Sequence, residues 1–226
     1  MFPALSMPGL TIQNLRFSHP GSSFALQVKD LRVGAGSAFA LLGPSGAGKT
    51  TLLRLMAGLL KPEIGDVRLD KTSLLSLSEA ERRAFRLTQI GMVFQDFALL
   101  DYLTVEENIL LPHCFHALGK NRAALADHAR TLADQLGIER HWQQLAGRLS
   151  QGEKQRVAII RALAHRPRFL FADEPTASLD ATRRGQVMEL LSRYTREQQA
   201  TFILVTHDTD LIPLFPDHAR VEDFTA

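Results

Sequence analysis

The stretch SAFALLGPSGAGKTTLLRLMAGL, residues 37–59, decides the fold of this chain. An apolar run typical of a buried strand leads into a glycine-rich loop, and the segment after the loop has the composition of a buried helix. Gly43, four further residues and then Gly48, Lys49 and Thr50 match the phosphate-loop pattern, in the strand–loop–helix context that this pattern requires. We therefore predict that the loop binds a nucleoside triphosphate.

The residue types in the loop explain this chemistry. Glycines allow main-chain N–H groups to turn inward around phosphates, the Lys49 ammonium neutralises the outer phosphates, and the Thr50 hydroxyl is placed to ligate Mg²⁺. The predicted binding residues are Gly43, Pro44, Ser45, Gly46, Ala47, Gly48, Lys49, Thr50 and Thr51. A glycine-rich turn without a ligand is the alternative, and the strand and helix on either side argue against it.

Composition narrows the class of protein. The chain has 226 residues, of which 45% are apolar and 22% charged, as in a globular domain with a good core. Its 26 basic and 24 acidic residues leave a net charge of +2, so no nucleic-acid binding driven by overall charge is expected. The single cysteine, Cys114, fits a reducing compartment. We expect neither a secretory signal in residues 1–9 nor a membrane span.

Strands and helices alternate along the chain. Periodicity and turn residues predict strands at 10–17, 24–33, 37–43, 90–95, 168–175 and 201–208. They predict helices at 50–59, 78–87, 104–111, 122–136 and about 183–198, with a further helix that begins at Ser150. Thr104 and Glu107 have capping-box spacing. Buried strands alternating with helices at both ends predict a parallel sheet interrupted by a helical insert.

Polar residues follow three of the predicted strands. Asp173 and Glu174 end the run FLFADEP, where Asp173 could hold Mg²⁺ and Glu174 could polarise the water that attacks the γ-phosphate. Gln95 could reach Mg²⁺ and a metal-bound water, and His207 could contact the γ-phosphate. An acidic pair can also simply end a strand, and a terminal Gln or His can be structural.

A second helix start follows at LSQGEKQR, residues 149–156. The Ser150 hydroxyl, the Gly152 amide and the helix dipole could bind an anion, while Ser150 and Glu153 have the spacing of a capping box. Both functions can coexist, and nothing requires the anion to be the chain's own nucleotide.

The ordered set GPSGAGKT, Gln95, LSQGEKQR, FLFADEP, SLD (178–180) and His207 resembles the nucleotide-binding subunit of ATP-binding-cassette (ABC) transporters over essentially the whole chain. The resemblance implies an α/β fold: a P-loop NTPase core with a mixed, mainly parallel sheet, an N-terminal antiparallel β subdomain and a helical insert. It implies a single domain over 1–226, with the ATPase core in about 1–95 and 166–226 and the helical subdomain in 96–165.

The resemblance also implies ATP and Mg²⁺ as cofactors, and a head-to-tail dimer in which the signature Ser150, Gln151, Gly152 and Glu153 of one copy covers the nucleotide of the other. In that comparison Glu174, His207 and Gln95 are the catalytic residues, and Thr50, Gln95 and Asp173 hold the metal. Phe17 is similar to the aromatic residue that stacks on adenine, and Asp180 to the acid that links the two sites. The sequence departs from the family pattern at Gln151, Lys154 and Phe17, without loss of Ser150 or Gly152.

Residues 87–112, together with the signature, are most similar to the branch of lipoprotein-releasing, macrolide-efflux and cell-division ATPases. This implies an ATPase at the inner face of the cell membrane that powers a separate permease in export, lipoprotein release or mechanical envelope work. A nucleotide-gated scaffold without transport is the alternative, and the transported substrate stays open. Four apolar residues would line part of a groove for a helix of the membrane partner, or form local core: Phe97, Leu99, Leu100 and Leu103.

Overall fold

The computed structural model of the protein describes residues 8–21, 24–114, 122–177 and 179–224. They fall into two compact units, the first within Met1–Arg83 and Thr195–Ala226 and the second within Ala84–Tyr194. Residues 1–7, on which the expectation about a secretory signal depends, and Ser178 of the SLD motif lie outside the described residues.

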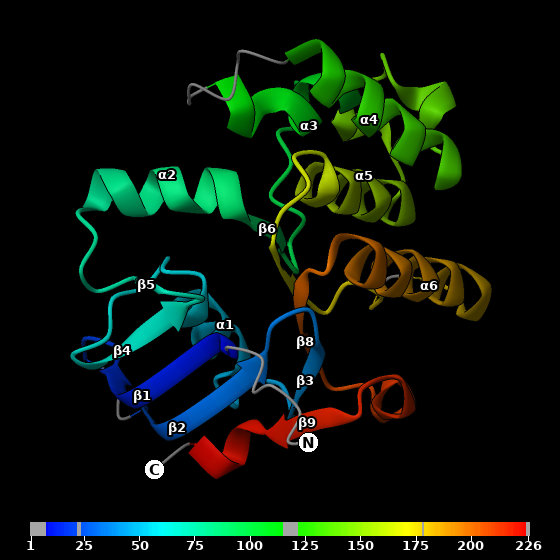
Figure 1. The fold of residues 1–226 in the computed structure, drawn as a ribbon. Helices are drawn as coiled ribbons and strands as arrows, with labels where there is room; N and C mark the ends of the chain where they lie inside the picture. Colours follow the sequence, from blue (N-terminus) through cyan, green and yellow to red (C-terminus); the bar gives the residue numbers. More distant parts are fainter. Residues whose placement is uncertain (1–7, 22–23, 115–121, 178, 225–226) are drawn as a thin grey trace, which may run out of the picture. The chain divides into compact units, whose positions relative to one another are not determined.

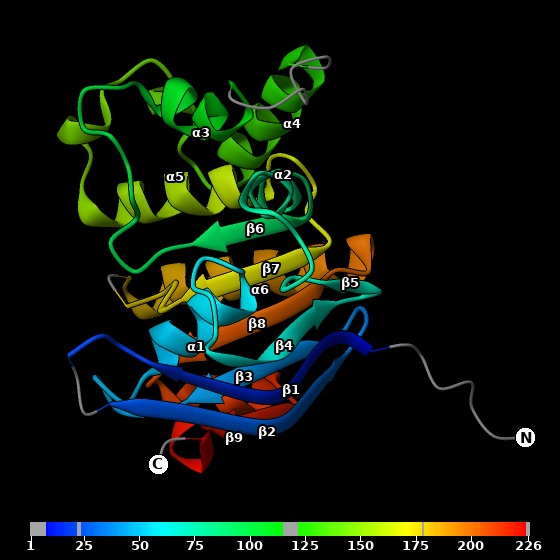
Figure 2. The same cartoon turned by 90° about the vertical axis from the view of Figure 1, so that its left-hand side faces the viewer.

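An antiparallel sheet forms one part of the first unit. Its strands, in spatial order, are β2 (Ala25–Gly34), β1 (Pro8–Ser18), β4 (Ile64–Leu69) and β5 (Thr72–Ser73), as Figure 2 shows. In β1, the buried apolar side chains are Leu10 and Ile12 in the first half, where Thr11 is buried as well, and then Leu15 and Phe17, which are shifted by one residue. The shift occurs at Asn14, whose φ is 47° and where the register with β4 changes.

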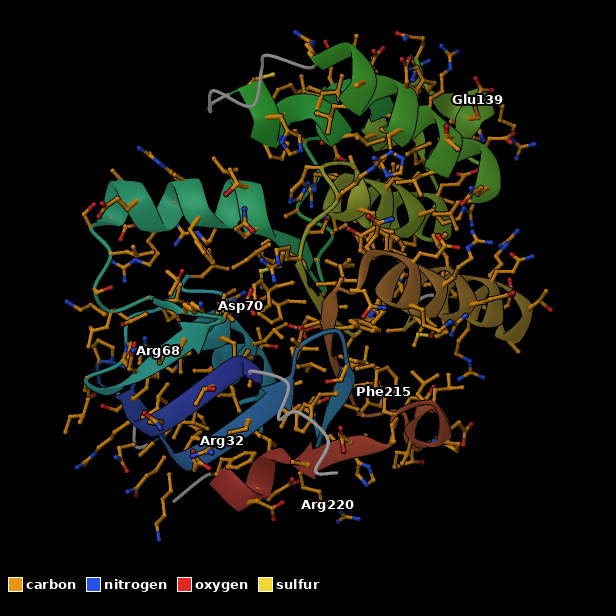
Figure 3. All side chains as sticks on the ribbon, in the orientation of Figure 1. Arg32, Arg68, Asp70, Glu139, Phe215 and Arg220 are labelled. Atoms are coloured by element: carbon orange, nitrogen blue, oxygen red, sulfur yellow. The ribbon has the colours of Figure 1, made fainter. Side chains whose placement is uncertain are left out.

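The sequence pattern predicts β1 and β2 but not β4 and β5. Gly65 and Asp66 stand at the start of β4, and both residue types are uncommon in strands. Arg68 and Asp70 mark the hairpin between β4 and β5 in Figure 3, where an Arg68 Nη2 group donates to the Lys71 carbonyl at 3.2 Å. The antiparallel pairing with β1 therefore stabilises a strand that local preference alone would not form.

A parallel group of strands forms the other part of the first unit. β3 (Ala38–Leu42) lies between β8 (Thr201–Thr206) and β9 (Asp217–Arg220), and both pairings are parallel. Helix α1 (Lys49–Met56) packs against β8. The residues after His207 form short 3₁₀ helices at Thr209–Leu214 and Val221–Phe224 on either side of β9, and the ring of Phe215 packs against Phe202 at 5.6 Å between centroids (Figure 3).

The second unit contains two parallel strands and most of the helices. Strand β6 (Ile90–Val93) pairs with β7 (Phe169–Asp173), all of whose residues are buried, as expected for a strand covered on both faces. The helices are α3 (Val105–Cys114), α4 (Arg122–Gln135) and α5 (Gln151–Leu163), with 3₁₀ turns at Glu139–His141 and Ala146–Arg148. Helices α3 and α4 both pack against α5 (Figure 1). Helices α2 (Glu79–Gln89) and α6 (Ala181–Gln198) each include residues of both units.

Helix α5 lies very close to strand β6. A Cβ atom added at Gly91 would meet the Ala162 carbonyl oxygen and the Pro167 ring, so this position requires glycine. The antiparallel N-terminal sheet, the parallel strands and the intervening helices confirm the predicted fold class. No helix in the described ranges is long and apolar enough to cross a membrane.

Candidate functional site

The phosphate loop connects β3 to α1, as the sequence predicts. Gly46 and Gly48 have φ of 82° and 97°, a region that other residues rarely adopt, and nothing lies within 4 Å of a Cβ built at Gly46. Lys49 is only 7% exposed, and its ammonium donates to the carbonyl oxygens of Gly43 at 2.7 Å and Pro44 at 2.9 Å. The loop therefore curls around a fixed positive charge, and the open space at Gly46 suits a loop that holds phosphate.

Three aromatic rings lie beside this loop. Phe17, the predicted adenine-stacking residue, pairs with Leu26 in the sheet and is 7% exposed. His19 is exposed, contacts the edge of Phe17 at 4.8 Å between ring centroids, and places its Nε2 atom 3.2 Å from the Thr51 hydroxyl. The Phe24 ring occupies the space in which a Gly48 side chain would lie. The ring that is open to solvent next to α1 is thus His19, which sequence reasoning missed.

His207 and the phosphate loop lie at one edge of the first unit's parallel strands. Leu42, the last residue of β3, pairs with Thr206, the last residue of β8. Gly43 and His207 are the next residues along the two strands, and His207 is exposed. The structure thus brings these two predicted site residues to the carboxyl ends of neighbouring strands, where ligands of α/β folds bind.

Gln95, Asp173 and Glu174 share such an edge in the second unit. Val93 pairs with Ala172, so Gln95 follows the end of β6 while Asp173 ends β7. Asp173 is 4% exposed, whereas Gln95 is exposed and Glu174 half-buried. Glu174 has φ of 49°, a left-handed conformation that costs a non-glycine residue about 1–2 kcal/mol. Strain of this kind concentrates at functional sites.

Ser150 begins α5 with a complete capping box. Its main-chain N–H and its hydroxyl donate to the Glu153 carboxylate at 2.8 Å and 2.7 Å, and the Glu153 N–H donates back to the hydroxyl oxygen at 3.4 Å. The N–H groups of Gln151 and Gly152 take no part in the box, although they belong to the helix turn that lacks intrahelical acceptors. The predicted cap is confirmed, and it leaves donors for an anion.

Positive charge surrounds this helix start. The Arg156 guanidinium is half-buried, and burial, followed by the charge of Arg183, lowers its pKa. Burial raises the pKa of Glu153, but hydrogen bonds from Ser150 together with His141 and Arg156 outweigh it, so that pKa is lowered overall. Glu153 therefore stays ionised as a cap, and the arginines favour an anion nearby.

Asp180 caps helix α6. Its carboxylate accepts from the Arg183 N–H at 2.9 Å and lies 3.4 Å from the Arg183 guanidinium. The structure places Asp180 in the second unit, as it does Ser150 and Glu174.

Among the described residues no group of three or more His, Cys, Asp or Glu side chains could hold a metal. Mg²⁺ at nucleotide sites is usually bound through oxygen ligands, with one or two carboxylates besides phosphate and water, and Thr50, Gln95 and Asp173 each offer an oxygen atom of that kind.

The apolar segment after Gln95 is only partly available to a partner. Phe97 is 9% exposed and belongs to the core, whereas Leu99, Leu100 and Leu103 are half-buried. Tyr102, which sequence reasoning did not single out, is 73% exposed. Its own neighbours in sequence are polar or aliphatic, so only the structure distinguishes its exposed ring from the buried ones.

Comparisons with known proteins agree with this site. A family model described as ABC transporter matches residues 26–177. The lipoprotein-releasing system ATP-binding protein LolD of Syntrophotalea carbinolica is 42% identical over 182 residues, which span 80% of this chain and 79% of that protein. The macrolide export ATP-binding/permease protein MacB of Rhodopirellula baltica is 39% identical over 181 residues, which span 80% of this chain and 26% of that protein.

A solved structure is also similar. The dimeric post-hydrolysis state of the ATP-binding cassette MJ0796, bound to ADP and Pi, is 31% identical in sequence. It superposes with a TM-score of 0.81, and the alignment covers 93% of each chain.

Proposed function

Because this chain belongs to the ABC transporter family, as an ATP-binding and ATP-hydrolysing subunit, we propose that it powers a separate membrane permease from the inner face of the cell membrane. The similarity to LolD and MacB favours lipoprotein release, export or mechanical envelope work. We assign the surface that meets the permease to the helical subdomain, residues 96–165, where Tyr102 is exposed. The observation that carries the proposal is that the chain has two helix starts suited to phosphate, one after Gly48 and one at Ser150.

The first helix start binds the chain's own nucleotide in this proposal. Lys49 neutralises the β- and γ-phosphates, and the loop N–H groups hold them in place. Thr50, Gln95 and Asp173 would hold Mg²⁺, which would neutralise charge that develops on the phosphates. We place the base against the exposed ring of His19, which Phe17 supports through its edge contact.

Hydrolysis depends on residues that orient water. Glu174 accepts a proton from the attacking water, Gln95 holds that water in position, and His207 donates a hydrogen bond to a γ-phosphate oxygen. The strained backbone of Glu174 supports this role, since it fixes the carboxylate at the end of a buried strand.

The second helix start serves another copy of the chain. The N–H groups of Gln151 and Gly152, with the Ser150 hydroxyl, cover the γ-phosphate that the partner copy holds, and Asp180 connects the two sites. The dimeric MJ0796 structure supports this arrangement. The capping box holds Ser150 at the start of the helix, and its hydroxyl, which donates its one proton to Glu153, must turn toward the phosphate when the partner copy's nucleotide binds.

Replacement of Glu174 by Gln tests the proposal. We expect ATP turnover to fall by about 100-fold or more, because the general base is lost while the side-chain shape is kept. ATP-bound dimers should accumulate in light scattering after size exclusion. Glu189→Gln, at an exposed position of α6, is the matched control and should behave as the parent. A Glu174→Gln protein that turns over normally, or stays a monomer with Mg-ATP, would contradict the assignment.

A further inference from the structure

Helix α5 holds two other segments of the second unit through three polar side chains. The Lys154 ammonium lies 2.8 Å from the Asp101 carboxylate, and the buried Gln155 amide donates to the Pro175 carbonyl, just after Glu174. The guanidinium of Arg161 donates to the main-chain carbonyls of Phe97 at 2.5 Å and Ala98 at 2.6 Å. The helix that begins at the signature is therefore attached both to the segment after Glu174 and to the segment after Gln95.

Arg161 makes the most restrictive of these attachments. Its planar guanidinium presents two N–H groups in a fixed geometry to two consecutive carbonyls, which the ammonium of a flexible lysine would hold less rigidly. Burial lowers the pKa of Arg161 to about 10, against the opposing effect of Asp96, so the group stays charged at neutral pH. Hydrogen bonds from a charged donor are stronger than those between neutral groups.

The carbonyls that Arg161 binds belong to an unusual stretch of backbone. Phe97 and Ala98 have φ of 62° and 47°, two consecutive left-handed residues without a glycine. Non-glycine residues adopt this conformation as single residues more readily than in succession. Contacts from outside the segment must therefore hold it, and those of Arg161 reach both residues.

The rest of the segment is fixed by Asn108. This side chain, 1% exposed, accepts from the Leu100 N–H at 2.8 Å and donates to the carbonyls of Leu100 at 3.0 Å, Leu103 at 3.2 Å and Thr104 at 3.0 Å. These hydrogen bonds gather Leu100, Leu103 and Thr104 around one side chain of α3, within the loop that carries the exposed Tyr102.

We propose that Arg161 is a positioning residue that couples the signature helix to the segment 96–104, so that nucleotide-driven movement of either one moves the other. This inference rests on the proposed function, because it uses Gln95 and Ser150 as the two places at which nucleotide acts. It adds the physical connection between them and extends it to the loop that presents Tyr102.

Hydrogen exchange tests the coupling. Arg161→Met removes the charged donors and keeps an unbranched side chain. Arg161→Lys keeps the charge but not the rigid, planar pair of donors. Arg130→Met, at an exposed site of α4, is the matched control. All are made in the Glu174→Gln protein, and exchange is followed by mass spectrometry in segments 43–51, 96–104 and 150–156 with and without Mg-ATP.

In the parent and in Arg130→Met, we expect ATP to protect all three segments. In Arg161→Met, the ATP-dependent protection of 96–104 should fall about tenfold or more, while that of 43–51 persists, and Arg161→Lys should lie between the two. If Arg161 had a purely structural role, its loss would lower the protection of 96–104 equally with and without ATP. The ratio of protection with ATP to protection without ATP therefore separates coupling from a structural role. Far-ultraviolet circular dichroism checks folding, and Arg161→Lys decides the question if Arg161→Met does not fold.

Two results would overturn the inference. One is a parent in which ATP protects 43–51 but leaves 96–104 unchanged, and the other is an Arg161→Lys or Arg161→Met protein whose 96–104 segment responds to ATP like the parent. A parent in which ATP fails to protect 43–51 contradicts the proposed function itself.

Discussion

A methyl group added at Gly152 should separate the stability of the protein from its activity. Gly152 is the second residue of α5, and its φ lies outside the left-handed region that requires glycine. A Cβ atom there would lie 3.3 Å from the Leu179 Cδ2 atom and 3.8 Å from an Arg156 guanidinium nitrogen. The closer contact involves the end of a flexible side chain, which can yield by a few tenths of an ångström.

The structure sets the size of both effects. Alanine is favoured over glycine within helices by about 0.5–1 kcal/mol, so the free energy of unfolding of Gly152→Ala should stay equal to that of the parent or rise by up to this amount. ATP turnover should fall about 100-fold or more, because the methyl group stands beside an N–H group proposed to hold the γ-phosphate of the partner copy, and loss of one such donor has an effect of this size.

Gly185→Ala supplies the matched control. Gly185 lies within α6, and nothing is within 4 Å of a Cβ built there, so the same substitution should raise stability without affecting turnover. Urea unfolding measures the first quantity and phosphate release the second. A Gly152→Ala protein with normal turnover would refute the role of this helix start, and one that is destabilised by more than about 1 kcal/mol would refute the packing argument.

Two further predictions concern histidines. Burial lowers the pKa of both His113 and His165 to about 4, so the unfolded chain, in which histidine titrates near 6.5, binds more protons below that pH. The free energy of unfolding, measured in urea, should be highest above about pH 6.5 and fall progressively toward pH 4. His113→Phe should make this dependence on pH less steep, and an equally steep dependence in both proteins would contradict the prediction. His19→Ala should weaken ATP binding by about tenfold in calorimetry, which is the scale of base–aromatic stacking, while His19→Tyr should preserve it. An unchanged affinity in His19→Ala would show that His19 does not contact the base.

The sequence predicts those parts of the structure that local rules specify. The phosphate loop needs Gly48 and Lys49 at fixed spacing between a strand and a helix, and both lie there. The capping boxes at Thr104 and Ser150 depend only on residues three positions apart, and both form. In each case the interacting groups are neighbours along the chain, so spacing alone is sufficient.

Features that depend on residues far apart in the chain could not be predicted from the sequence. Whether Phe17 or its neighbour faces the core is decided by the irregularity at Asn14, and periodicity does not specify an irregularity. Strand β4 forms because β1 is available as its partner. The contact of Arg161 with Phe97 joins residues that are 64 positions apart, and a basic residue on a helix normally indicates only a solvated face.

The close approach of Gly91 to Ala162 affects how loss-of-function variants should be interpreted. Strand β6 lies so close to the last turn of α5 that any side chain at position 91 would push the two elements apart. Because a helix is rigid, displacement of its C-terminal turn also changes the position of its N-terminal turn, which begins at Ser150. A variant at Gly91 can thus abolish activity although Gly91 lies at the opposite end of α5 from the signature. Such a result would show that α5 has been displaced, and would not show that Gly91 takes part in catalysis.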